Sequence, residues 1–209
     1  PTNMAPCLSH YGYLELQIVT RGRRMHASLA NRGLNPVETM LQLLLKISHY
    51  LRTSRPDIVY NIRELESAPA GVAVPERGEA WLDFHIPPSA PTGEITMDIE
   101  ELIASEQQQS QAFEGTFRFT TIHAGYTLPE KGVIIDALKT QFARRSLPWT
   151  PQPFPSHSDA NLLWAAGVKT ILLGCGELEN AHAPDESISL PQVQLAAEIY
   201  LDLILSLSR

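Results

Sequence analysis

Cysteine is scarce in this sequence, because the 209 residues contain only Cys7 and Cys175. Two cysteines cannot form the disulfide framework of a small secreted domain, so we expect a reducing, cytoplasmic location. No uninterrupted apolar run approaches the roughly 18–20 residues of a membrane span, and residues 1–10 lack the pattern of a signal peptide. The sequence therefore predicts a cytoplasmic protein without a membrane partner.

An excess of basic charge is also missing. The formal net charge is −7, and acidic and basic residues are interspersed, which argues against nucleic acid as the main partner. The HExxH, CxxC, P-loop and GxGxxG motifs are absent as well, so the commonest short signatures of metal and nucleotide sites do not apply. What is present is an ordinary globular composition, with 44% hydrophobic and 19% charged residues.

Residues 11–124 show a strand and helix order that is typical of one fold. Alternating apolar residues predict strands at 11–22, 57–67, 77–88 and 115–124, and helical periodicity predicts helices at 35–51 and 92–109. This βαββαβ order predicts a ferredoxin-like α+β domain, in which two helices cover one face of an antiparallel sheet. The apolar stripe of the first helix is expected to contain Val37, Met40, Leu41, Leu44, Leu45 and Ile47.

Residues 125–209 show a different pattern, in which the predicted elements are α/β in character. Helices are predicted at 129–145, 158–167 and 189–207, and one short strand is predicted at 168–174. The four prolines of 147–157 predict an extended loop or an edge strand. One strand is too few for an independent sheet, so this segment is interpreted as part of a larger domain.

Two histidines are candidates for chemistry. His182 lies in "ENAHAPDESISL", directly after a Gly-x-Gly turn, where a neutral imidazole could bind zinc; the alternative is an ordinary surface histidine. His26 follows Arg21, Arg23 and Arg24, and this basic loop could hold an anion or polarise a carbonyl. The alternative for His26 is a solvated basic loop.

Two further features have simpler explanations. Ser156, His157, Ser158 and Asp159 suggest a catalytic triad only weakly, because no G-x-S-x-G turn accompanies them, and Ser158 and Asp159 are ordinary helix caps. Cys175 lies between two glycines, where a small residue is needed for packing.

Three stretches together resemble the M20 family of zinc metallopeptidases. "YGYLELQIVTRGRRMHASLANRGLNPVE" and "VAVPERGEAWLDFHIPP" resemble its lid domain, and "SHSDANLLWAAGVKTILLGCGELENAHAPDESISL" resembles its C-terminal metal-site segment. The resemblance implies an α/β catalytic domain that binds two zinc ions and is interrupted by a ferredoxin-like lid through which chains form homodimers. Accordingly, residues 1–10 are interpreted as a linker, 11–124 as the lid and 125–209 as the C-terminal portion of the catalytic domain.

The resemblance also implies roles for individual residues. His182 would be a zinc ligand, and His26 would reach the partner's active site and stabilise the oxyanion formed when a zinc-bridged hydroxide attacks an amide carbonyl. Ser156, His157, Gly174 and Gly176 would line the substrate pocket. Two positions depart from the family pattern: Val72 stands where asparagine is frequent, and His85 where arginine is frequent.

In this family the remaining zinc ligands and the general base precede the lid, whereas this sequence begins at "PTNM". We therefore expect a fragment of a dizinc enzyme that hydrolyses N-acyl amino acids or small peptides, inactive as this chain and with zinc absent or weakly bound. The alternatives are a non-catalytic dimerisation module, or a pseudoenzyme that binds an acidic ligand through Arg21, Arg23, Arg24 and His26.

Overall fold

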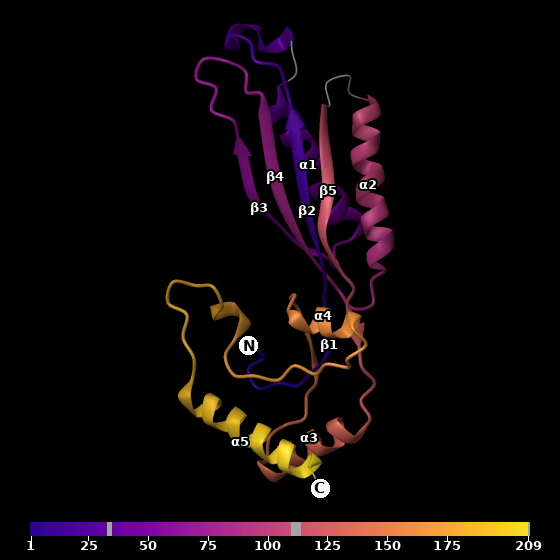
Figure 1. Ribbon diagram of the computed structural model, residues 1–209, viewed down its shortest axis with the longest axis vertical. Coiled ribbons are helices and arrows are strands. Elements are labelled where there is room, and N and C mark those ends of the chain that lie inside the picture. Colours follow the sequence, from indigo (N-terminus) through magenta and orange to yellow (C-terminus); the bar gives the residue numbers. More distant parts are fainter. Residues whose placement is uncertain (33–34, 110–113, 209) are drawn as a thin grey trace. The chain divides into compact units, whose positions relative to one another are not determined.

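The structure, a computed structural model, describes residues 1–32, 35–109 and 114–208. The chain divides into two compact units (Figure 1). The central unit comprises residues 12–124, and the terminal unit comprises residues 1–11 together with 125–209.

The central unit contains a four-stranded antiparallel sheet with the strand order β3-β4-β2-β5. Its elements are β2 (Gly12–Arg21), the 3-10 helix η1 (Ala27–Arg32), α1 (Pro36–Ser54), β3 (Val59–Ser67), β4 (Arg77–Ile86), α2 (Thr92–Gln109) and β5 (Glu114–His123). Leu14, Leu16 and Ile18 of β2 alternate with less buried residues and pair with β4 in register. These side chains and the apolar faces of α1 and α2 form one core. The predicted ferredoxin-like order is therefore confirmed.

Helix α1 begins as the sequence predicts, because the Asn35 side chain accepts a hydrogen bond from the Val37 backbone amide at 3.1 Å. The predicted stripe was partly wrong, however. Leu43 and Leu51 are buried, whereas Leu41 and Leu45 are 45% and 70% exposed. Helix α1 is apolar around much of its circumference, so its periodicity does not by itself identify the face that packs on the sheet.

The terminal unit contains a three-stranded sheet with the order β6-β1-β7. Its elements are β1 (Cys7–His10), β6 (Tyr126–Thr127), α3 (Val133–Arg144), β7 (Gln152–Phe154), α4 (Asp159–Ala165), the 3-10 helix η2 (Leu178–Asn180) and α5 (Leu190–Leu207). β1 is antiparallel to β6 and parallel to β7. The structure thus differs from the interpretation of residues 1–10 as a linker, because Cys7–His10 forms the central strand of this sheet.

The strand predicted at 168–174 does not form. Only Leu172 makes an isolated bridge, in which its backbone N–H and C=O groups bond to Cys7. Helix α3 starts at Val133 instead of residue 129, after Gly132, which has a φ of 125°. Helices α4 and α5 lie where the sequence predicts them.

Among the described residues, α5 alone has the length and mean hydropathy, 1.2, of a possible membrane span, and 11% of it is buried. One such helix is weak evidence, because a core helix of a globular domain passes the same test. Ala196 and Ile199 of α5 are buried in a cluster with Leu138 and Phe142 of α3. The absence of a membrane partner stays a prediction.

Candidate functional site

The N-terminal residues are bound to the glycine turn that precedes His182. The Thr2 and Met4 amides donate to Gly174 O at 3.3 and 2.9 Å, and the Asn3 amide donates to Gly176 O at 2.7 Å. The Asn3 side chain donates to Glu177 Oε1 at 3.2 Å. Gly176 has a φ of 81°, the left-handed region that favours glycine. The predicted Gly174–Gly176 turn therefore anchors the start of the chain.

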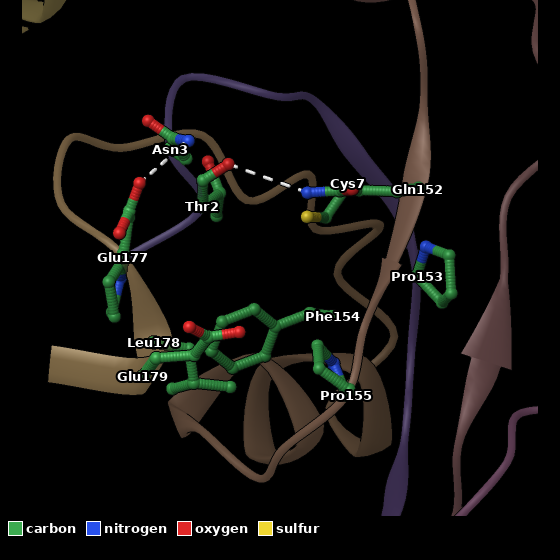
Figure 2. A pocket seen from close by; sticks show the side chains of 11 residues that line it. Thr2, Asn3, Cys7, Gln152, Pro153, Phe154, Pro155, Glu177, Leu178 and Glu179 are labelled. Atoms are coloured by element: carbon green, nitrogen blue, oxygen red, sulfur yellow. Dashed lines mark hydrogen bonds between the residues drawn. The ribbon is translucent and has the colours of Figure 1, made fainter. Parts of the chain in front are cut away.

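A pocket of about 470 Å³ opens beside this anchored segment (Figure 2). Asn3, Cys7 and Phe154 line it together with the carboxylates of Glu177 and Glu179. Burial raises the pKa of the Cys7 thiol to about 11, so at neutral pH this group is a protonated thiol and not a nucleophile. The pocket is therefore acidic without a reactive side chain.

His182 lines an adjoining pocket of about 530 Å³ with Pro1, Gly176, Glu177 and Glu186 among its walls. The His182 backbone has a φ of 62°, which is unusual for a residue other than glycine. Its amide donates to Glu186 Oε2 at 3.1 Å. Strained backbone of this kind clusters at functional sites, because packing around the site must hold it.

The described residues do not complete a metal site around His182. Within residues 1–32, 35–109 and 114–208, no group of three histidine, cysteine, aspartate or glutamate residues is arranged to hold an ion. A catalytic zinc needs about three protein ligands. His182 can thus offer one ligand, and the described residues by themselves do not fit the two zinc ions that the family resemblance implies.

Ser156 and His157 lie in the loop between β7 and α4, beyond Pro155. Pro155 lines the acidic pocket, but neither Ser156 nor His157 belongs to the described lining of that pocket or of the His182 pocket. Their role in substrate binding stays a prediction.

Ser158 is hydrogen-bonded to His10, a histidine that the sequence analysis did not single out. His10 is fully buried; its Nε2 lies 2.7 Å from Ser158 Oγ and its Nδ1 lies 2.9 Å from Tyr11 O. Because a carbonyl only accepts, Nδ1 carries the proton and Nε2 accepts from the serine hydroxyl. Ser158 Oγ also accepts from the Ala160 amide at the start of α4. Burial lowers the pKa of His10, so this pair is a neutral, buried link between β1 and α4.

His26 belongs to the central unit and is exposed. Its backbone forms an isolated antiparallel bridge with Ala73, flanked by hydrogen bonds from the Ala27 amide to Val72 O and from the Val74 amide to Met25 O. The His26 side chain is therefore presented to solvent from a backbone that is held on both sides. Val72, one of the departures from the family pattern, contributes its carbonyl to this support.

His85 lies on the sheet face opposite the core, with its ring 5.5 Å from that of Tyr13. Its Nδ1 is buried and has no hydrogen-bond partner within the described part of the chain. Burial lowers the pKa of His85, while the nearby Asp83 opposes that shift. A neutral histidine at this position cannot supply the fixed positive charge of an arginine.

Comparison with known proteins identifies the class to which this fold belongs. Residues 8–111 match the family model of the peptidase dimerisation domain, and the chain belongs to the M20 family of metallopeptidases. Acetylornithine deacetylase of Edwardsiella ictaluri is 26% identical over 90% of this chain and 50% of its own length. The corresponding enzyme of Photorhabdus laumondii is 23% identical over 98% of this chain and 54% of its own. The chain thus spans about half the length of the curated relatives it matches.

Solved structures share the fold across both units. An aminopeptidase PepT from Bacillus cereus aligns with a TM-score of 0.77 and 14% identity, covering 100% of this chain and 55% of its own. An amidase of the hydantoinase/carbamoylase family from Burkholderia vietnamiensis aligns with a TM-score of 0.79 and 14% identity. The alignment covers 96% of this chain and 49% of the amidase. At these identities the likeness concerns the fold alone.

Proposed function

We propose that the chain is the lid and the C-terminal catalytic portion of an M20 metallohydrolase that cleaves an amide bond in an N-acyl amino acid or a small peptide. The family membership and the names of the relatives, which include deacetylases and peptidases, support this reaction class. On this proposal the 209-residue chain is inactive by itself, because its described residues hold no complete metal site.

The observation that carries the proposal is the position of Pro1. Pro1 and His182 line the same pocket, and the hydrogen bonds of Thr2, Asn3 and Met4 to the glycine turn fix the chain at this point. Consecutive Cα atoms are about 3.8 Å apart, so a residue joined to Pro1 would lie at or next to the wall of the pocket that His182 also lines. A carboxylate there, with others from the preceding half, would complete a site of which His182 supplies one zinc ligand.

The exposed surface of α5 independently supports the proposal that the intact enzyme has a further catalytic portion. Its inner side packs on α3, yet Leu190, Leu201, Ile204 and Leu205 are all more than half exposed. Exposed apolar side chains of this number on one helix are typical of a surface that a second part of the protein covers, which the remainder of the intact enzyme would provide.

His26 would act on the substrate's carbonyl oxygen in the partner subunit. A histidine N–H aimed at the oxygen that becomes negative in the transition state stabilises that charge. Bound zinc would polarise the same carbonyl and activate water. The chain's own contribution is the exposed His26 side chain, presented from a backbone fixed at Val72 and Val74.

The homodimer would form at the β3 edge of the central sheet. Within the described residues β3 pairs only with β4, so its outer backbone groups are available to a second copy. Ile62 and Leu65 of this strand are 39% and 49% exposed, and Leu41 and Leu45 of α1 are exposed as well. The Ser48 and Tyr60 hydroxyls, 2.6 Å apart, join α1 to β3. These residues form an apolar strip that a two-fold related copy would cover.

Two experiments test the proposal. In the intact enzyme, His182→Ala should remove most of the bound zinc. His49→Ala, which changes an exposed residue of α1, should leave the zinc content unchanged. Full zinc occupancy in His182→Ala would exclude the ligand role.

The second experiment measures the dimer of the 209-residue chain by sedimentation. Leu45→Lys should weaken this dimer by about tenfold or more, whereas Ile122→Lys on the opposite edge strand should not.

The second candidate is a dimerisation module without catalysis, favoured by the lack of three clustered metal ligands in the described residues. Sequencing the coding DNA upstream of Pro1 separates the two. An H-x-D motif and a Glu-Glu pair in frame support the enzyme, and a start codon directly before Pro1 supports the module.

A further inference from the structure

The imidazole of His26 is held by the residue two positions further along the chain. Its Nδ1 lies 2.8 Å from Ser28 Oγ, and the Ser28 backbone N–H donates to the same Nδ1 at 3.3 Å. A backbone amide can only donate a hydrogen bond, so Nδ1 must present its lone pair. In the neutral ring the proton is then on Nε2.

The opposite nitrogen is left available. His26 is exposed, and within the described part of the chain its Nε2 makes no hydrogen bond. The backbone on both sides of the ring is fixed: the Ala27 amide donates to Val72 O at 2.9 Å, and the Leu29 amide donates to His26 O at 2.9 Å. The Nε2–H group is therefore a hydrogen-bond donor on the side of the ring away from Ser28, which contacts Nδ1.

We propose that Ser28 is a positioning residue that holds His26 as the Nε2–H tautomer, in the rotamer that offers this N–H to the oxyanion of an amide substrate. The inference rests on the proposed function, because it assigns Ser28 a role in the same step as His26. Ser28 does not touch the substrate; it acts by occupying Nδ1 from both its amide and its hydroxyl.

The tautomer can be measured on the 209-residue chain without any activity. Long-range ¹H–¹⁵N spectra at about pH 8.5, two units above the ordinary pKa of histidine, distinguish a protonated from an unprotonated ring nitrogen, and a His26→Gln variant assigns the signals. We expect wild-type His26 to be Nε2–H. Ser28→Ala should shift the ring towards a tautomer mixture, Ser28→Thr should restore it, and Ser105→Ala, which removes an exposed hydroxyl bonded to Leu102 O, should have no effect.

In the intact enzyme, Ser28→Ala should lower kcat by about three- to tenfold, the factor that corresponds to one ordinary hydrogen bond, with little change in KM and recovery in Ser28→Thr. An Nδ1–H tautomer in the wild type, or no spectral change in Ser28→Ala, overturns the inference. An unchanged kcat in Ser28→Ala overturns it too, provided that His26→Ala is inactive. If His26→Ala itself turns over normally, the proposed role of His26 fails, whatever the tautomer.

Discussion

Replacing His10 with leucine should destabilise the terminal unit and also change how its stability depends on pH. Leucine removes the bonds to Tyr11 O and Ser158 Oγ. Tyr11 O keeps the Asn161 side chain as a donor at 2.9 Å, but the Ser158 hydroxyl loses its acceptor. Two lost bonds at about 1 kcal/mol each would cost about 2 kcal/mol, and the apolar replacement offsets part of this, so we expect a destabilisation of about 1–2 kcal/mol at pH 7.5.

The pH effect follows from the lowered pKa of His10. Below its ordinary pKa of about 6.5, the unfolded state binds a proton that the folded state resists. Wild-type stability should therefore fall as the pH drops below about 6.5, and stop falling below the folded pKa. The fall amounts to about 1.4 kcal/mol for each unit by which folding lowers the pKa. His10→Leu should lack this part of the pH dependence.

Urea unfolding in a Trp81→Phe background measures this effect, because Trp149 and Trp164 then report on the terminal unit alone. His85, whose pKa is also lowered by burial, is present in both proteins, so the difference between them isolates His10. Identical pH slopes between pH 7.5 and 5 in the two proteins would refute the reasoning.

Three further predictions concern stability and reactivity. Asn35→Ala should destabilise the central unit by about 1 kcal/mol in urea unfolding, because it removes the cap of α1, whereas Ser189→Ala should have little effect, since that cap side chain makes no hydrogen bond. Gly176→Ala should cost the terminal unit about 1 kcal/mol because its φ of 81° is strained for alanine; Gly174→Ala, whose added Cβ meets nothing within 4 Å, is the matched control. Cys7, with its pKa at about 11, should react with iodoacetamide at pH 8 roughly 100-fold more slowly than an ordinary free cysteine, and rapid labelling of the folded chain would contradict its burial.

The central unit could be predicted because its signals are local. Alternation in β2 and β4, and the Asn35–Pro36 start of α1, each lie within one element. The terminal sheet could not be predicted in the same way. β1 has four residues and pairs with β6 and β7, which are more than 110 residues away, so no local pattern distinguishes it from a linker. The apolar run 168–174 has strand composition but makes only the bridge of Leu172.

The residues of the candidate site likewise differ in whether local sequence could predict their contacts. His26 and Ser28 are two residues apart, and an H-x-S pattern in a basic loop would have been a usable signal. His10 and Ser158 are 148 residues apart, and neither belongs to a recognisable motif. The pocket that Pro1 and His182 share depends on the tertiary hydrogen bonds between residues 2–4 and the glycine turn. The family resemblance anticipates His182 only as a metal ligand.

Subunit complementation tests the central claim most directly. In the intact enzyme, the His26→Ala and His182→Ala homodimers should each be nearly inactive. Random exchange of equal amounts makes half of the dimers mixed, and each mixed dimer has one site with both His182 and the partner's oxyanion donor. The account predicts recovery to about a quarter of wild-type turnover, the product of these two halves. No recovery after complete exchange would contradict the assignment of His26 and His182 to one shared site.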